Sequence, residues 1–283
     1  MSAQKIAVVT GANKGIGYQI VRGLCKNYDG IVYLTSRDEE RGKDAVAELE
    51  KENLKPRFHQ LDITQQNSID KFKDFIANEH GGFDLLVNNA ATAFPQKSNV
   101  PMPEQAKKTL EVNYFSTLRF CEAMFPLLRT NARVVNVSSL LGHLSKIPSE
   151  AKRKELSRPD LTIPELSKLM EKYVLDVQSG KAETEGWGSS NYVVSKVGIS
   201  AFTNIQQRIF DEETPSRGIS INSVHPGWVR TDMTGNKGHK SSEQGAAAPL
   251  WLALEANLKG KYVWDDCSVV DWCAKSTPPI PPL

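Results

Sequence analysis

A glycine-rich turn near the N-terminus constrains the fold of this chain most strongly. Residues 5–10 form an apolar, β-branched run typical of a buried parallel strand, and helical spacing covers residues 18–26. Glycines between a strand and a helix permit a tight turn and a close approach of the backbone to a pyrophosphate, whose charge the helix N-terminus favours. The spacing is G-x-x-x-G-x-G, not the better-known G-x-G-x-x-G, and in this context we predict phosphate binding in preference to an ordinary turn. The expected contacts are Gly11, Asn13, Lys14, Gly15, Ile16 and Gly17.

Strand and helix patterns alternate along most of the chain. Further strand-like runs cover residues 30–35, 56–61, 84–87, 133–139 and 218–224, with a last short strand within residues 261–271. Helical patterns cover residues 64–78, 106–128, 192–210 and 245–254, and a further helix is expected after the acidic run 38–40, ending at Leu49. This alternation predicts an α/β fold, a right-handed, doubly wound parallel sheet flanked by helices. We therefore expect a single Rossmann domain over residues 1–283, with a helical insertion at about 140–190 that contains a helix at Ile163–Gln178, and a frayed tail at 277–283.

The end of the second predicted strand carries information about the choice of cofactor. A carboxylate at this position would bind a ribose 2′-hydroxyl, whereas an arginine accommodates a 2′-phosphate. Here Ser36 and Arg37 come first, and Lys14 of the glycine turn is a second possible cation. The acidic run 38–40 is expected to cap and open the following helix. The sequence therefore favours NADPH or NADP+ over NADH.

A tyrosine and a lysine lie four residues apart in the predicted helix at 192–210. Tyr192 and Lys196 would share one face of that helix. A phenol is almost fully protonated at neutral pH, and a nearby ammonium stabilises the phenolate and lowers its pKa toward the range that acid–base catalysis requires. The pair alone also fits an ordinary helix surface, so its weight depends on the residues that accompany it.

Composition and charge narrow the class of protein. The chain has 283 residues and a net charge of +2, which gives no argument for nucleic acid or a membrane surface as partner. No segment approaches the length of a membrane span, and the N-terminus offers no signal peptide. The four cysteines form no CxxC pair and have no histidine at metal-ligand spacing. We therefore expect free thiols, no metal and a cytoplasmic location.

Several motifs occur together in a specific order. They are Thr10-Gly11…Gly15-Ile16-Gly17, Asn88-Asn89-Ala90, Asn113, Ser139 and Tyr192…Lys196. With these motifs the chain resembles the short-chain dehydrogenase/reductase family over essentially its whole length. Residues 134–139, residues 226–232 and the long segment before Tyr192 are most similar to the monomeric NADPH-dependent carbonyl reductases of that family.

The resemblance implies roles for the matched positions. Tyr192 would be the general acid toward a carbonyl oxygen, and Lys196 would lower its pKa and bind the nicotinamide ribose. Ser139 would orient and polarise the carbonyl, and Asn113 would hold a water that links Lys196 to solvent. The remaining expected contacts are Asn89, Asp62 and Ile63 on the adenosine side, Val229 and Thr231 at the nicotinamide amide, and Gln105, Leu140, Trp228 and Met233 at the substrate. For Trp228, core packing is the alternative.

The resemblance also implies a reaction and an oligomeric state. The expected function is NADPH-dependent reduction of small aldehydes, ketones and quinones by hydride transfer, in a monomer whose insertion covers the surface that relatives use to oligomerise. The alternatives are an NAD(P)+-dependent alcohol or steroid dehydrogenase and a non-catalytic dinucleotide redox sensor. Ala91 replaces a common glycine and requires torsions that permit a Cβ. His225 replaces a cysteine of some relatives, and we expect it to be a packed turn residue.

Overall fold

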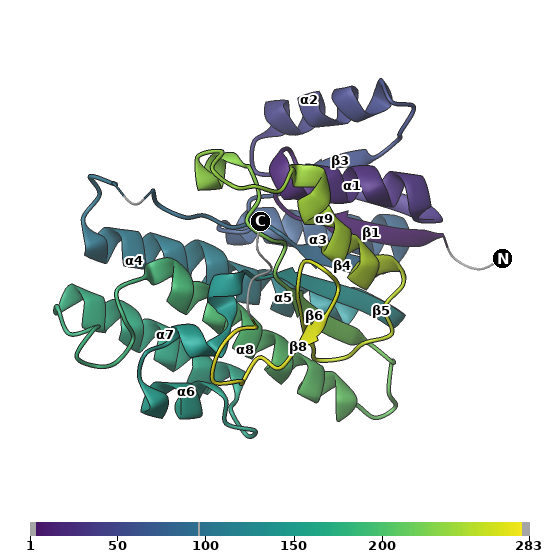
Figure 1. The fold of residues 1–283 in the computed structure, drawn as a ribbon. Coiled ribbons are helices and arrows are strands. Elements are labelled where there is room, and N and C mark those ends of the chain that lie inside the picture. Colours follow the sequence, from purple (N-terminus) through teal and green to yellow (C-terminus); the bar gives the residue numbers. More distant parts are fainter. Residues whose placement is uncertain (1–3, 96, 279–283) are drawn as a thin grey trace.

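The strands form one continuous sheet. The structure is a computed structural model that describes residues 4–95 and 97–278. The sheet is eight-stranded, in the order β3-β2-β1-β4-β5-β6-β7-β8 (Figure 1). The strands are β1 (Lys5–Val9), β2 (Gly30–Ser36), β3 (Arg57–Gln60), β4 (Phe83–Asn88), β5 (Leu128–Val137), β6 (Ser220–Val224), β7 (Tyr262–Val263) and β8 (Val269–Val270). All neighbours are parallel except β8, which is antiparallel to β7. The predicted α/β sheet is confirmed, but residues 261–271 hold a short antiparallel pair where a single strand was expected.

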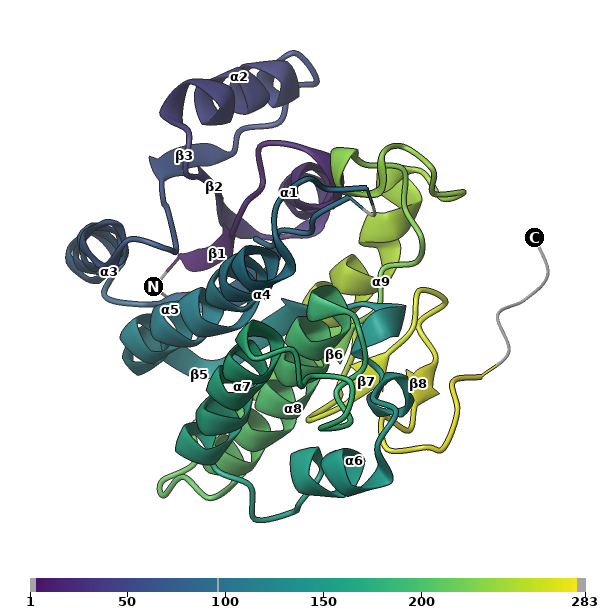
Figure 2. The same ribbon diagram turned by 90° about the vertical axis from the view of Figure 1, so that its left-hand side faces the viewer.

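Helices cover both faces of this sheet, as the doubly wound pattern predicts. They are α1 (Gly15–Asn27), α2 (Glu39–Glu50), α3 (Gln66–His80), α4 (Met102–Leu110), α5 (Ser116–Met124), α6 (Glu150–Leu156), α7 (Ile163–Gln178), α8 (Asn191–Asp211) and α9 (Ser242–Leu254). Alternate residues of β1 pack on opposite faces: Ala7 and Val9 meet the apolar sides of α1, α2 and α9, while Ile6 and Val8 meet α3 and α5 (Figure 2). The central strand is therefore buried on both sides.

The helix predicted over residues 106–128 is interrupted. A π-helical turn, η1 (Glu111–Phe115), separates α4 from α5, and the regular helix ends at Met124. Asn113 lies in this turn, where its amide oxygen accepts from the Thr92 N–H at 2.7 Å and its amide N–H donates to the Thr92 carbonyl at 2.9 Å. A π turn is unfavourable by itself, and here a contact with a distant loop accompanies it. Helical periodicity could not reveal that contact.

The insertion folds against α4 and α8. Its main helix, α7, has the bounds that the sequence predicts, and a capping box between Thr162 and Glu165 fixes its start. After α7, Trp187 is only 1% exposed, and its indole N–H donates to an Asp176 carboxylate oxygen at 2.9 Å. The insertion is thus anchored at its C-terminal end. The predicted tail at 277–283 lies largely outside the described residues.

Two further expectations concern the chain as a whole. The cysteines Cys25, Cys121, Cys267 and Cys273 are free thiols, as expected. Across residues 4–95 and 97–278, no helix has both the length and the apolar character that crossing a bilayer would require.

A chain of buried amides joins the sheet to α8. The Asn88 amide of β4 donates to the Asn136 amide oxygen of β5 at 2.8 Å, and the Asn136 amide N–H donates to the Thr203 hydroxyl of α8 at 2.9 Å. All three side chains are buried. Buried polar groups are stable only when they are hydrogen-bonded, so this chain specifies how α8 sits on the sheet.

We expect Asn136→Ala to destabilise the protein strongly. The change removes the shared buried partner of the Asn88 amide and the Thr203 hydroxyl, which keep only their contacts with the Cys121 sulfur and the Ile199 carbonyl. The free energy of unfolding should therefore fall by about 2–3 kcal/mol. Asn27→Ala, which removes an exposed side-chain hydrogen bond to the Gly23 carbonyl, is the control and should cost under about 0.5 kcal/mol. Urea unfolding measures both. Equal losses for the two variants would contradict the role of the amide chain.

Candidate active site

The glycine turn leaves room at the carboxyl edge of the sheet. Gly11 has a φ of +60°, and a Cβ on it would lie 2.9 Å from the Ala90 Cα. A Cβ on Gly17 would lie 2.4 Å from the Asn89 amide nitrogen. Among the described residues, no side chain caps the N-terminus of α1, as is also the case for α3 and α4. Free N–H groups, the helix dipole and a turn without side chains fit the pyrophosphate of a dinucleotide.

Asn89 holds the glycine turn in place. Its amide nitrogen donates to the Thr10 carbonyl at 2.9 Å and to the Gly11 carbonyl at 3.0 Å. The Thr10 hydroxyl in turn accepts from the backbone N–H groups of Asn89 and Ala90, both at 3.0 Å. The structure thus gives Asn89 a supporting role beneath the turn, beside the adenosine contact that was expected. Ala91 is not among the described non-glycine residues with positive φ, so its Cβ is tolerated there as required.

The predicted adenosine contacts are shaped by local packing. One Asp62 carboxylate oxygen accepts from the backbone N–H of Thr64 at 2.9 Å and from its hydroxyl at 2.7 Å, which closes a turn after β3. The Ile63 side chain is 6% exposed and belongs to the hydrophobic cluster under α3. The Ile63 side chain therefore faces the core, so a contact of Ile63 with an adenosine would have to come from its backbone.

The two predicted cations differ in their surroundings. Arg37 follows β2 directly and is exposed. The Lys14 ammonium pairs with the Asp232 carboxylate at 2.5 Å, and both side chains are more than half exposed. Asp232 was not singled out in the sequence, because its partner lies 218 residues away. An exposed pair of this kind is worth at most about 1 kcal/mol, so Lys14 can exchange it for another anion.

The four expected catalytic side chains come together at the carboxyl edge of the sheet. Ser139 follows the end of β5, while Tyr192 and Lys196 lie in the first turns of α8. The Lys196 ammonium is buried, donates to the Val137 carbonyl at 2.7 Å and lies 5.8 Å from the centre of the Tyr192 ring. Asn113 reaches α8 through the Ser195 hydroxyl, to which it donates at 3.0 Å.

Burial shifts both titratable groups of this site toward their neutral forms. Desolvation raises the pKa of Tyr192 to about 12, against a smaller opposing effect of the Ser139 hydroxyl. Desolvation also lowers the pKa of Lys196 to about 8. The sequence predicted that the ammonium would lower the phenol pKa. In this geometry burial outweighs that effect, and the ammonium is bonded to a backbone carbonyl.

The segment after β6 covers the glycine turn. Val229 is 2% exposed and packs against Gly245 of α9, where an added Cβ would lie 2.5 Å from the Val229 side chain. The Thr231 methyl lies 3.4 Å from the position that a Cβ on Gly15 would take. His225 is buried, and its Nδ1 accepts from the Gly227 N–H at 3.3 Å. Burial lowers the pKa of His225 to about 4. His225 is thus the packed turn residue that was expected.

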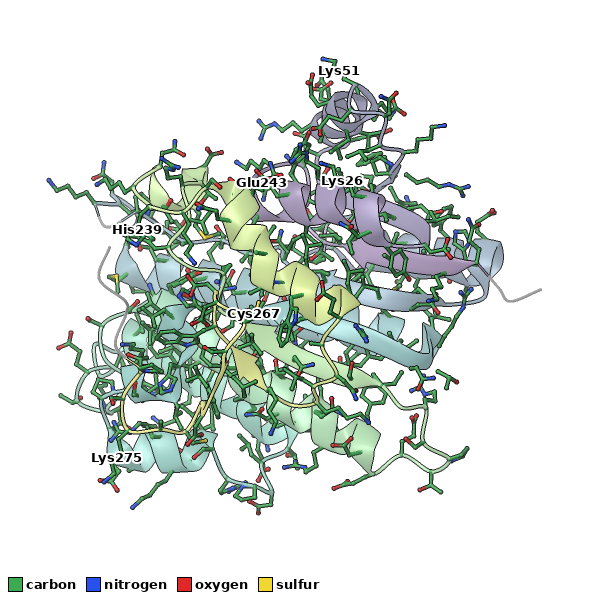
Figure 3. The ribbon with its side chains drawn as sticks, turned by 45° about the vertical axis from the view of Figure 1, so that its right-hand side comes forward. Lys26, Lys51, His239, Glu243, Cys267 and Lys275 are labelled. Atoms are coloured by element: carbon green, nitrogen blue, oxygen red, sulfur yellow. The ribbon has the colours of Figure 1, made fainter. Side chains whose placement is uncertain are left out.

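The residues predicted to contact the substrate differ in their exposure and packing. Trp228 is 51% exposed and meets His239 edge to face at 4.8 Å, so core packing is excluded (Figure 3 labels His239). Met233 is exposed on the same segment. Leu140 packs partly against the core, and the Gln105 amide donates to the Val100 carbonyl at 2.6 Å. Sequence reasoning missed Tyr262, whose hydroxyl donates to the Ser139 carbonyl from the short strand β7.

Known proteins resemble this chain in sequence and in fold. Residues 5–150 and 161–242 match the family described as short chain dehydrogenase. Carbonyl reductase (NADPH) 1 of Mus musculus is 45% identical over 255 residues, which cover 89% of this chain and 92% of that protein. Its counterpart in Sus scrofa is 44% identical over 277 residues, covering 96% and 95%. The structure of salutaridine reductase from Papaver somniferum matches with a TM-score of 0.82 and 30% identity, over 93% of this chain and 100% of that one.

We expect the pH dependence of stability to report the buried Lys196. Its pKa is about 8 in the folded protein and 10.5 in an unfolded chain, so the unfolded state binds more protons between these values and stability rises with pH there. Relative to Lys196→Met, which cannot titrate, the wild type should gain on the order of 2 kcal/mol of unfolding free energy from about pH 8 to about pH 10. Urea unfolding across this range measures the gain. A difference that does not change with pH would contradict the lowered pKa.

Proposed function

The chain belongs to the short chain dehydrogenase family, and we propose that it is an NADPH-dependent carbonyl reductase acting on small aldehydes, ketones and quinones. One observation carries this proposal: the Ser139 hydroxyl, the Tyr192 phenol and a buried Lys196 lie together at the carboxyl edge of the sheet, the edge that also holds the glycine turn. The relatives named carbonyl reductase (NADPH), at 44–45% identity over nearly their whole length, support the same activity.

Each part of the site has a chemical task in this proposal. NADPH, when bound, supplies the hydride that reaches the carbonyl carbon. The glycine turn and the N-terminus of α1 hold its pyrophosphate, and Lys196 its nicotinamide ribose. Tyr192 donates a proton to the carbonyl oxygen, and Ser139 donates a hydrogen bond to the same oxygen as negative charge develops on it. Asn113, bonded to Thr92 and Ser195, supports the hydration of Lys196.

A phenol whose pKa is raised to about 12 is neutral at physiological pH and can donate its proton to a carbonyl oxygen. An alcohol or steroid dehydrogenase is the less favoured assignment, because the relatives at 44–45% identity are named carbonyl reductase (NADPH). A non-catalytic redox sensor would have no use for an intact proton relay.

We also propose that the protein acts as a cytoplasmic monomer. The support is that α7 of the insertion packs across α4 and α8 (Figure 1), the surface that the family resemblance led us to expect the insertion to cover. The free cysteines fit a reducing compartment.

The test of the proposed activity is NADPH consumption with a panel of quinones, aromatic aldehydes, aliphatic ketones and steroids, repeated with NADH. We expect turnover of at least one class with a strong preference for NADPH, and identification of the alcohol or hydroquinone product. Tight NADPH binding without turnover of any carbonyl would instead favour the sensor.

We expect Tyr192→Phe to abolish most of the activity while NADPH still binds. Loss of a positioned general acid should lower kcat/KM by about 10²–10⁴-fold. Tyr28→Phe is the matched control, since the Tyr28 hydroxyl has no hydrogen-bond partner among the described residues, and it should retain wild-type turnover. Steady-state kinetics and NADPH fluorescence titration measure the two effects. Unchanged turnover in Tyr192→Phe would disprove the mechanism.

We expect Arg37→Asp to reverse the cofactor preference. A carboxylate here repels the 2′-phosphate and can bind a 2′-hydroxyl, so the ratio of kcat/KM for NADPH over NADH should fall by about 10–10³-fold. Arg41→Asp makes the same charge change on the first turns of α2, where the side chain is 68% exposed and pairs with Asp38, and it should leave the ratio nearly unchanged. If both variants changed the ratio equally, the preference for NADPH would come from the overall charge of this region and not from a specific contact of Arg37.

A further inference from the structure

The residue before the candidate catalytic tyrosine is held by the insertion. Asn191 is the first residue of α8 and is 7% exposed. Its amide oxygen accepts from the hydroxyl of Tyr173, a fully buried residue of α7, at 2.6 Å. Its amide nitrogen lies 4.0 Å from the sulfur of Met102 at the start of α4. Asn191 is thus fixed from two sides by elements other than its own helix.

The start of α8 needs such support. Tyr192 lies in the first helical turn, where backbone N–H groups have no partner within the helix. The only side-chain cap given by the described residues is the Ser190 hydroxyl, which accepts from the Val193 N–H at 3.3 Å. Helix ends tend to fray, so a contact at Asn191 restricts the position of the next side chain, Tyr192.

Tyr173 can act as a fixed support because its surroundings are rigid. Its ring meets the Trp187 ring edge to face at 5.6 Å. The Trp187 indole donates to Asp176, whose two carboxylate oxygens also accept from Lys172 at 2.9 and 2.8 Å. The Lys152 ammonium lies 4.9 Å from the Trp187 ring centre. Contacts with α7 and α6 thus hold Trp187, which lies in the segment that connects α7 to α8.

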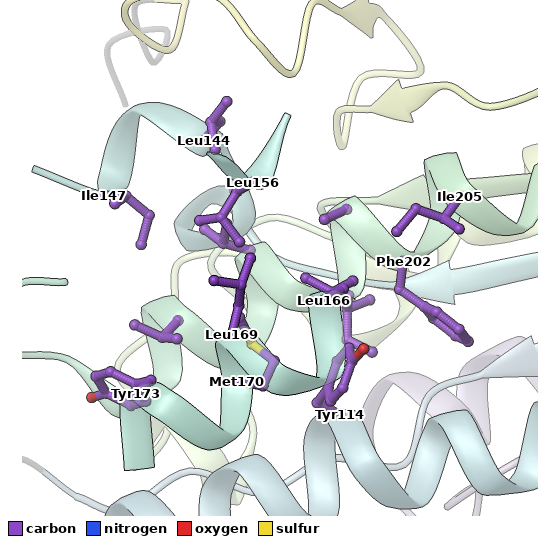
Figure 4. Packing of buried hydrophobic residues seen from close by; sticks show 14 of the residues in the cluster. Tyr114, Leu144, Ile147, Leu156, Leu166, Leu169, Met170, Tyr173, Phe202 and Ile205 are labelled. Carbon is purple, nitrogen blue, oxygen red and sulfur yellow. The ribbon is translucent and has the colours of Figure 1, made fainter. Parts of the chain in front are cut away.

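Helix α7 also contacts α8 close to Lys196. A Cβ on Gly198 would lie 2.8 Å from the Met170 sulfur and 3.2 Å from the Tyr114 ring, so α7 and η1 approach α8 as closely as a glycine permits. Figure 4 shows Leu166, Met170 and Tyr173 along α7, with Tyr114 nearby. Gly198 follows Lys196 by one intervening residue, and Tyr114 follows Asn113 directly. The insertion thus contacts the neighbours of three of the four candidate catalytic residues.

We propose that Tyr173 is a positioning residue for Tyr192 and acts through Asn191. This inference rests on the proposed function, because it assigns to the insertion the task of holding the proton donor in line with the carbonyl oxygen. The hydroxyl of Tyr173 does not touch substrate or cofactor in this role. Its hydrogen bond sets where the first turn of α8 begins and hence where the Tyr192 phenol points. Small displacements of a catalytic group cost large factors in rate.

The test compares two single-hydroxyl deletions on α7. Tyr173→Phe removes the bond to Asn191, whereas Ser167→Ala removes a bond of 3.1 Å between α7 and the Tyr114 hydroxyl that does not reach the start of α8. We expect Tyr173→Phe to lower kcat by roughly 5–50-fold with NADPH affinity within about twofold of wild type, and Ser167→Ala to keep kcat within about twofold. Equal losses of kcat in both variants would overturn the proposal.

A second measurement does not depend on turnover. With tyrosine labelled at the 13Cζ carbon, the NMR signal of Tyr192 is identified by its loss in Tyr192→Phe. Tyr173→Phe should shift this signal and its titration midpoint, and Ser167→Ala should leave both unchanged. If the wild type reduces no carbonyl, the proposed function fails, and this signal still decides the positioning role. An unchanged Tyr192 signal in Tyr173→Phe would refute it.

A second variant tests the same hydrogen bond in case Tyr173→Phe does not fold. Asn191→Ala removes the same hydrogen bond from the other side, and the double variant with Tyr173→Phe should lose no more activity than the more affected single variant. Losses of kcat that multiply in the double variant would show that the two residues act separately, against the proposal.

Discussion

The hydrogen bond between the buried Lys196 ammonium and the Val137 carbonyl is the interaction on which this site depends. It joins α8 to the end of β5 at 2.7 Å, two residues before Ser139. A buried ammonium is costly unless it is bonded, so this contact fixes the depth of α8 on the sheet. Because Tyr192 lies one turn away, the same contact sets the distance between the phenol and the serine hydroxyl.

Sequence periodicity was sufficient for the fold because the buried elements repeat simple patterns. The alternation of Ala7 and Val9 with Ile6 and Val8 follows from a strand covered on both faces, and the capped, amphipathic α7 has the bounds that its pattern predicts. The π turn at Glu111–Phe115 could not be predicted, because it accompanies a contact between Asn113 and the distant Thr92. Contacts across the chain are invisible to local periodicity.

The same distinction holds within the candidate site. Motifs identified which residue types gather at the sheet edge, and Ser139, Tyr192, Lys196 and Asn113 do meet there. The motifs did not indicate which way each group would point. Asn89 directs its amide N–H groups into the glycine turn, and the pairing of Lys14 with Asp232 joins segments far apart in sequence. Direction depends on neighbours that only the folded chain supplies.

The insertion is best understood through the burial of α8. This helix has buried residues on nearly all sides and little amphipathic character, and a helix of that kind needs a partner on each face. The sheet supplies one partner through Asn136 and Thr203, and α7 supplies the other through Met170 at Gly198. Without the insertion, the outer face of α8 would be open to water unless another subunit covered it. The segment that covers this surface is therefore also the one that can hold α8 in register on the sheet, and with it the candidate proton donor Tyr192.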